Sequence, residues 1–202
     1  MRYIRFVRTD NGDWSTRHSV LIMARRAAAL INALAGDRPD PATVAGVLDA
    51  YGESGQAELT AADITEMRAA ATVLRDVFAA EHVDDAAATL NRLLREHTGP
   101  LRLTSHEATT PWHPHLDHND NAPWGQWLLA SSCMALTVLV WDRQRPPGRI
   151  CSSPSCRDVF ITQGSGPERR YCSRRCATRE RVAAHRRARL AAQTRAEDRN
   201  GQ

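Results

Sequence analysis

The chain has 202 residues, which is enough for one domain with a substantial core and one small additional module. All 27 basic residues are arginine: residues 1–150 carry 15 against 18 acids (net −3), whereas residues 151–202 carry 12 against 5 (net +7). The first ten residues alternate arginine with apolar residues, so we expect no secretory signal peptide. Because Gly-x-Ser-x-Gly, phosphate-loop and dinucleotide motifs are absent, we also expect no enzyme.

The first two predicted helices are bounded by glycine and proline. Apolar residues recur at spacings of three and four from about 16 to 35, and Gly36 follows as a stop signal. Asp40 and Pro41 have the types preferred at the N-cap and the first position of a helix. They predict a short second helix that ends before Gly52.

Two longer helices are predicted next. Thr60 and Asp63 form a capping-box pattern, in which each side chain bonds the backbone of the other, at the start of a helix that reaches Phe78. We expect Asp84 or Asp85 to cap the following helix, which a Gly-Pro pair ends. The first hundred residues are therefore mainly helical.

Residues 101–116 favour a small β-hairpin interrupted by prolines. Histidines in and after this segment raise the hypothesis of a second metal site, because alternate strand residues project to one face. Ligand type without geometry is weak support for a metal, and polar loops with scattered imidazoles are usually solvated. We therefore prefer a solvated loop for this group: His106, His113, His115 and His118, with Asp117 and Asp120 nearby.

Residues 124–141 form an uncharged segment with a tryptophan at each end, features that a membrane span would share. The segment is at the lower length limit for a span and contains Gly125, Gln126, Ser131 and Ser132. We predict that it is the central helix around which the amphipathic helices pack.

Four of the five cysteines lie in two close pairs near the C-terminus: Cys151, Cys156, Cys172 and Cys176. Paired thiolates bind Zn²⁺ tetrahedrally, and four of them fill its coordination sphere, so the expected zinc is structural. The alternatives are two disulfides or four unrelated thiols. Disulfides are rare in the reducing cytoplasm, where we expect this chain to stay.

The segment between the cysteine pairs predicts a treble-clef-like zinc finger. Residues 159–162 and 169–171 are expected as paired strands joined by a turn at 164–167, after a polar knuckle at 152–155. Ser173 is expected to cap a helix that carries Cys176 on its first turn. The finger would thus end in a helix.

This C-terminal helix is rich in arginine and predicts contact with the phosphates of nucleic acid. A narrow apolar stripe of Cys176, Ala183 and Leu190 would lie against the zinc hairpin. The alternative is a solvated charged helix, and the composition leaves DNA and RNA both open. The predicted DNA-contacting residues are Arg174, Arg175, Arg179, Arg181, Arg186, Arg187 and Arg189.

The cysteine-rich segment resembles the CGNR zinc finger of bacterial transcription regulators. The resemblance rests on Cys151-x4-Cys156, on Arg-Arg-Tyr-Cys-Ser at 169–173 and on the run that follows. The signature Cys-Gly-Asn-Arg is present as Cys-Ala-Thr-Arg at 176–179, and the last cysteine pair is one residue closer than the family pattern. The resemblance implies zinc, and in this family the finger follows an N-terminal ABATE domain, a stress-induced regulator module.

The upstream sequence also resembles an ABATE domain, through Ala29-Leu-Ile-Asn-Ala-Leu and through Leu59-Thr-Ala-Ala-Asp with the helix after it. We predict a predominantly helical α+β protein in three parts: an ABATE-like domain with a small β-hairpin (1–145), a zinc finger with a basic helix (146–192) and a polar tail (193–202). The predicted function is a zinc-dependent, DNA-binding transcription regulator whose N-terminal domain senses a small molecule or forms a homodimer, without membrane contact. A protein-interaction module and a zinc-thiolate redox sensor are the alternatives.

Overall fold

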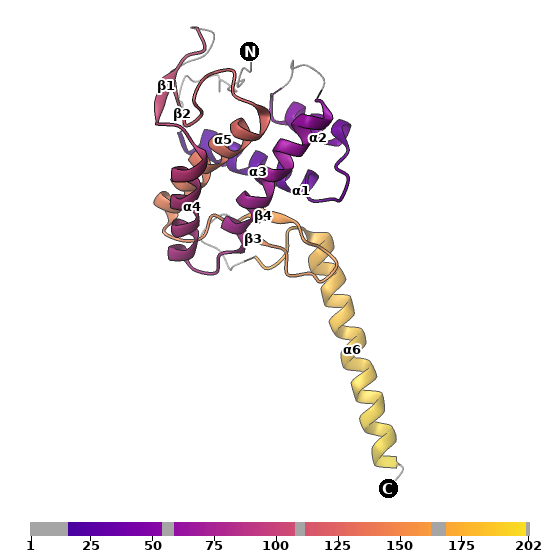
Figure 1. Ribbon diagram of the computed structural model, residues 1–202. Coiled ribbons are helices and arrows are strands. Elements are labelled where there is room, and N and C mark those ends of the chain that lie inside the picture. Colours follow the sequence, from indigo (N-terminus) through magenta and orange to yellow (C-terminus); the bar gives the residue numbers. More distant parts are fainter. Residues whose placement is uncertain (1–15, 54–58, 108–111, 163–168, 201–202) are drawn as a thin grey trace.

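The computed structural model describes residues 16–53, 59–107, 112–162 and 169–200 (Figure 1). Within these ranges the protein is predominantly helical, with two small antiparallel sheets, as predicted. The elements in chain order are α1 (Thr16–Ala33), α2 (Pro41–Ala50), α3 (Ala61–Ala79), α4 (Val83–His97), β1 (Arg102–Thr104), β2 (His113–His115), α5 (Trp124–Arg143), β3 (Gly148–Ile150), β4 (Val159–Ile161) and α6 (Arg174–Asn200).

Helix α5 is the centre of the fold and packs against α1, α3 and α4. Leu128, Cys133 and Leu136 are fully buried along it. Gly125 lets α5 approach α3 closely, because a Cβ at this position would lie 2.8 Å from the carbonyl oxygen of Glu66. By length and composition α5 could cross a membrane, but most of its apolar stretch is buried inside the protein, which confirms the core interpretation.

The capping predictions are confirmed for two helices and wrong for a third. Asp40 accepts hydrogen bonds at the start of α2, and Thr60 and Asp63 form the capping box of α3. Helix α4 instead begins after His82, without a side-chain cap, and Asp84 and Asp85 lie within its first turn. Carboxylates in a first turn stabilise a helix through its dipole, so these residues support α4 without capping it.

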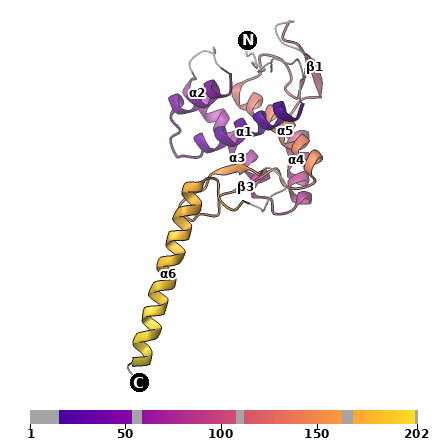
Figure 2. The same cartoon turned by 180° about the vertical axis from the view of Figure 1, so that it is seen from behind.

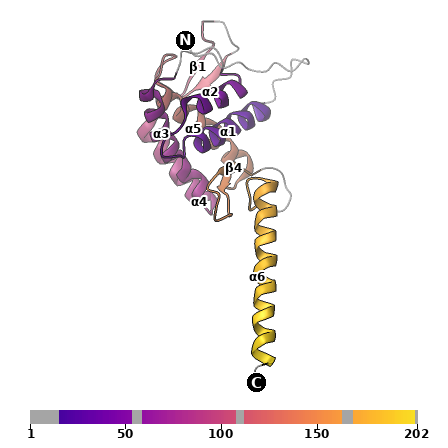
Figure 3. The ribbon, with the colours of Figure 1, turned by 90° about the vertical axis from the view of Figure 1, so that its right-hand side faces the viewer.

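The two hairpins lie at different ends of the helical body. Strands β1 and β2 pair antiparallel, as predicted, at the end remote from α6 (Figures 1 and 3). The prediction for the second hairpin is partly wrong, because β4 pairs with β3 and not with residues 169–171. The two strands approach closely at Gly148, where a Cβ would lie 2.4 Å from the carbonyl oxygen of Phe160. The predicted turn at 164–167 lies outside the described residues.

The β3–β4 hairpin is built into the core of the helical body. Val159 and Ile161 are 2% and 6% exposed and belong to the same hydrophobic cluster as α1, α3 and α5. The side chain of Asn32 in α1 binds the backbone of Val159 in both directions: its Nδ2 donates to the carbonyl at 2.9 Å, and its Oδ1 accepts from the N–H at 2.8 Å. One side chain thus attaches β4 to α1.

We expect Asn32→Ala to lower the free energy of unfolding by about 1–3 kcal/mol, because it leaves a part-buried N–H and a carbonyl of β4 without their partner. Chemical denaturation of the zinc-loaded protein measures this effect. Asn91→Ala, on the exposed side of α4, is the matched control and should change stability by less than about 0.5 kcal/mol. Equal effects of the two substitutions would contradict the role given to Asn32.

Candidate metal centre and the basic helix

The four C-terminal cysteines converge on one point. Their four Sγ atoms all lie within 4.8 Å of one another. The Sγ atoms of Cys156 and Cys172, and those of Cys172 and Cys176, are 3.7 Å apart. A tetrahedron with metal–sulfur bonds of about 2.3 Å has edges of about 3.8 Å, whereas a disulfide measures about 2.05 Å. The cluster therefore fits a tetrahedral zinc ion and not a pair of disulfides.

Local structure brings each sulfur to this point. Cys151 directly follows β3, and a tight turn in the knuckle presents Cys156, whose N–H donates to the Ser153 carbonyl at 2.9 Å. The Cys176 N–H donates to the hydroxyl of Ser173 at 3.3 Å, which confirms the predicted cap at the start of α6. Two ligands thus come from a β-knuckle and two from a helix start, the arrangement predicted from the spacing.

Hydrogen bonds tie the basic helix to the knuckle around the sulfurs. The Arg179 guanidinium donates to the Sγ of Cys176 at 3.4 Å and to the hydroxyl of Ser153 at 2.8 Å. That hydroxyl in turn donates to Glu180 at 2.6 Å. Arg179, one of the predicted DNA-contacting residues, therefore holds the finger together and offsets the negative charge of thiolates.

Without a cation the cluster favours protonated sulfur at some of its positions. Burial raises the pKa of Cys156 to about 11 and also raises the pKa of Cys172, whereas the Ser173 hydroxyl lowers the pKa of Cys176. A metal must displace these protons, so its affinity falls in acid. Cys133 differs: it lies alone in the core, where burial raises its pKa to about 12 and keeps it a neutral thiol.

Helix α6 projects away from the body (Figure 2), and its sequence is rich in arginine. At 100° per residue, six of the seven predicted arginines fall within an arc of about 160°, and Arg187 lies outside it. All seven are exposed. The predicted apolar stripe against the hairpin is wrong beyond the first turns: Cys176 is buried and Ala183 half-buried, but Leu190 is 63% exposed, because α6 has left the hairpin by then.

The histidines of the β1–β2 region are not solvated, so that prediction was wrong for three of them. His106, His113 and His115 are 1%, 7% and 8% exposed and lie together, whereas His118 is exposed and outside the group. Burial lowers the pKa of His106, which favours the neutral imidazole. Burial also acts to raise the pKa of Asp117, but hydrogen bonds from His115 and Arg102 outweigh it and keep Asp117 ionised. The signal available in the sequence was the alternation of His113 and His115.

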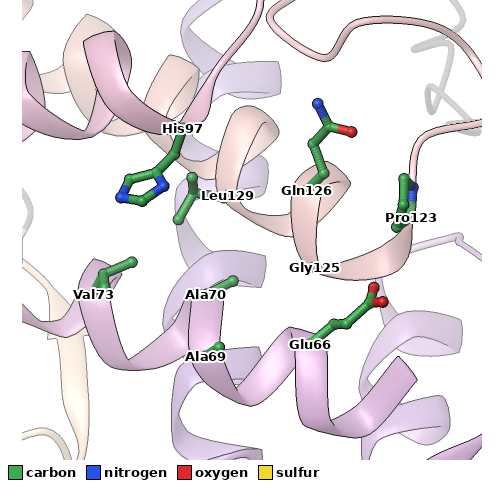
Figure 4. A pocket seen from close by; sticks show the side chains of 9 residues that line it. All are labelled: Glu66, Ala69, Ala70, Val73, His97, Pro123, Gly125, Gln126 and Leu129. Atoms are coloured by element: carbon green, nitrogen blue, oxygen red, sulfur yellow. The ribbon is translucent and has the colours of Figure 1, made fainter. Parts of the chain in front are cut away.

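A shallow groove of about 470 Å³ lies between α3 and α5, beside the end of α4 (Figure 4). Its floor is made of small residues, Ala69, Ala70 and Gly125, and its rim includes Glu66 and His97. It is open and mostly apolar, and its few polar side chains do not converge on a common point. The groove alone does not indicate a ligand.

Comparison with known proteins identifies the C-terminal part. Residues 148–189 match the family described as CGNR zinc finger, a range that begins at β3, contains all four clustered cysteines and ends within α6. No curated protein matches the sequence. The resemblance to the CGNR family predicted from the cysteine-rich segment is thus confirmed, and the ABATE resemblance of residues 1–145 stays a prediction.

Proposed function

We propose that this CGNR zinc finger binds DNA through α6, and that the protein is a cytoplasmic bacterial transcription regulator whose helical part senses a small molecule or dimerises. The observation that carries the proposal is the exposed arginine face of a helix that stands clear of the body. Zinc has a structural role, because four thiolates leave no coordination position for water.

Positive charge is concentrated on α6 and the segment before it, so a polyanion would bind there and not on the acidic body. Residues 169–189 hold nine arginines and one acid, whereas residues 1–150 are net negative. Arginines that neutralise phosphates release condensed counterions, and a guanidinium can also bind a guanine edge in the major groove. An α-helix of about 10–12 Å diameter fits the major groove of about 12 Å width.

The arginines of the finger divide into two roles. Arg179 positions the knuckle against α6 through Ser153 and Cys176. The outward face supplies the phosphate contacts, and three of its members lie within an arc of about 80° along the helix: Arg174, Arg181 and Arg189.

We expect the triple substitution of these three residues by alanine to weaken binding to random duplex DNA and to flatten its salt dependence. Each lost phosphate contact lowers the log–log slope by about 0.9, so the slope should fall by up to about 2.7. Fluorescence anisotropy over a salt series, with zinc content verified, measures both quantities. The control removes the same charge from exposed positions on the body: Arg38, Arg68 and Arg95.

The control variant should retain the wild-type slope. Equal losses in both triple variants would mean that net charge, and not α6, governs binding. A zinc-loaded wild-type protein that binds no duplex DNA at low salt would overturn the proposal and favour the protein-interaction role. Parallel titrations with duplex RNA determine which nucleic acid is preferred.

A further inference from the structure

Three buried histidines come together beside the β1–β2 hairpin. This hairpin lies at the end of the body remote from α6 (Figures 1 and 3). His113 and His115 are the two ends of β2, and His106 follows β1. Their ring centroids are 4.8–5.1 Å apart. One ring nitrogen from each lies within 4.8 Å of the others, a separation that one ion can bridge.

Carboxylates orient two of these rings. His115 Nδ1 lies 2.9 Å from both carboxylate oxygens of Asp117, and His106 Nδ1 lies 3.3 Å from an oxygen of Asp120. An ionised carboxylate only accepts, so the Nδ1 of His115 carries the proton and its Nε2 keeps its lone pair. The Nε2 of His115 points to His113, 2.9 Å from that residue's Nε2. Metal-binding histidines almost always donate their other N–H in this way.

The carboxylates are themselves held in place. Arg102, paired with His115 across the hairpin, donates from Nη2 to Asp117 at 2.7 Å and to Asp120 at 2.6 Å. The hydroxyl of Thr104 donates to the second oxygen of Asp120 at 3.1 Å. The carboxylates thus hold the imidazoles, and Arg102 and Thr104 hold the carboxylates, so the group is preorganised.

The backbone at His106 also has an unusual conformation. Its φ is 47°, in the left-handed region that costs free energy for a residue other than glycine, and its N–H donates to Thr104 at 3.1 Å. This conformation accompanies a ring that is only 1% exposed. The backbone is therefore strained at the residue that supplies the third imidazole, His106.

We propose that His106, His113 and His115 bind a divalent transition metal ion such as Zn²⁺, and that Asp117 and Asp120 orient the ligands. Metal–nitrogen bonds of about 2.05 Å require nitrogens about 3.3 Å apart, so His113 and His115 need to separate by only about 0.4 Å. Three imidazoles leave one tetrahedral position for water or an added ligand, unlike the closed four-cysteine centre. This site goes beyond the proposed DNA binding and is independent of it.

Cobalt(II) titration of the untagged, metal-free, reduced full-length protein tests the proposal, because thiolate and imidazole sites have different spectra. We expect two ions per chain: one with sulfur-to-cobalt charge-transfer absorption, and one with d–d bands alone. His113→Gln/His115→Gln should lose the second class and keep the first. His118→Gln, an exposed neighbour outside the group, is the matched control and should bind both.

After dialysis, the His113→Gln/His115→Gln variant should contain one equivalent of zinc less than the wild-type protein. Circular dichroism shows whether the double-histidine variant is folded, and if it is not, a Cys172→Ser/Cys176→Ser protein serves as the second test. That protein should still bind one ion, without charge-transfer absorption. The proposal is overturned if the wild-type protein binds only the thiolate-coordinated ion, or if the folded double-histidine variant binds as much metal as the wild type.

Discussion

Serine in place of Cys172 is expected to release the metal from the zinc finger and to unfold the knuckle at 152–155 and the start of α6, whereas β3 and β4 stay packed in the core. The serine hydroxyl does not ionise near neutral pH, so a thiolate ligand is lost from a site where zinc binding in comparable peptides contributes about 10–16 kcal/mol. Cobalt–thiolate absorption reports the metal at this centre alone, and hydrogen exchange maps the unfolded segment. We expect helices α1 to α5 to stay protected.

Cys133→Ala is the matched control for this substitution, because Cys133 is a neutral thiol in the core and lies outside the cluster. It should keep the cobalt–thiolate absorption and lose only about 1 kcal/mol of stability through the small cavity. Full cobalt–thiolate absorption in the Cys172→Ser protein would show that this cysteine is not a ligand.

Glu53→Ala is expected to cost about 3–5 kcal/mol, because it leaves the guanidinium of Arg26 buried without its counter-charge. The two residues are 5% and 2% exposed and form an ion pair beneath α5. Arg26 also donates to Ser131 at 2.9 Å and lies 4.5 Å from the ring centroid of Trp127. Urea denaturation measures the loss in the zinc-loaded protein.

Asp76→Ala is the control for this pair, because Asp76 and Arg92 form an exposed ion pair at 3.7 Å and the change should cost less than about 1 kcal/mol. Burial lowers the pKa of Arg26 and raises that of Glu53, although each charge partly offsets the effect on the other. The double change Arg26→Met/Glu53→Leu should therefore cost less than Glu53→Ala alone. A larger cost would show that the ion pair itself stabilises the fold.

Local patterns in the sequence were sufficient for the helices and the metal centre. The capping box of Thr60 and Asp63, the cap at Ser173 and the cysteine spacing each depend on residues a few positions apart. The partner of β4 was missed because the pairing with β3 spans the knuckle and depends on a close contact at Gly148, which no periodicity reports.

The burial of the histidines was missed for a related reason. The alternation of His113 and His115 indicated a shared face, but solvation depends on what covers that face. Here Arg102 forms ion pairs with both Asp117 and Asp120, and the three charged side chains hold the polar group together beside α5. This arrangement is a property of tertiary packing and cannot be derived from the spacing alone.

Asn32 attaches β4 to α1, and the knuckle that follows β3 is bonded to α6 through Ser153 and Arg179, so the core sets the position of the base of α6. A 27-residue helix is about 40 Å long. A tilt of about 5° at its base would move its far end by about 3.5 Å, roughly the spacing of one base pair along DNA. In the proposed complex with DNA, a small displacement of α1 would therefore shift the tip of α6 by about one base pair.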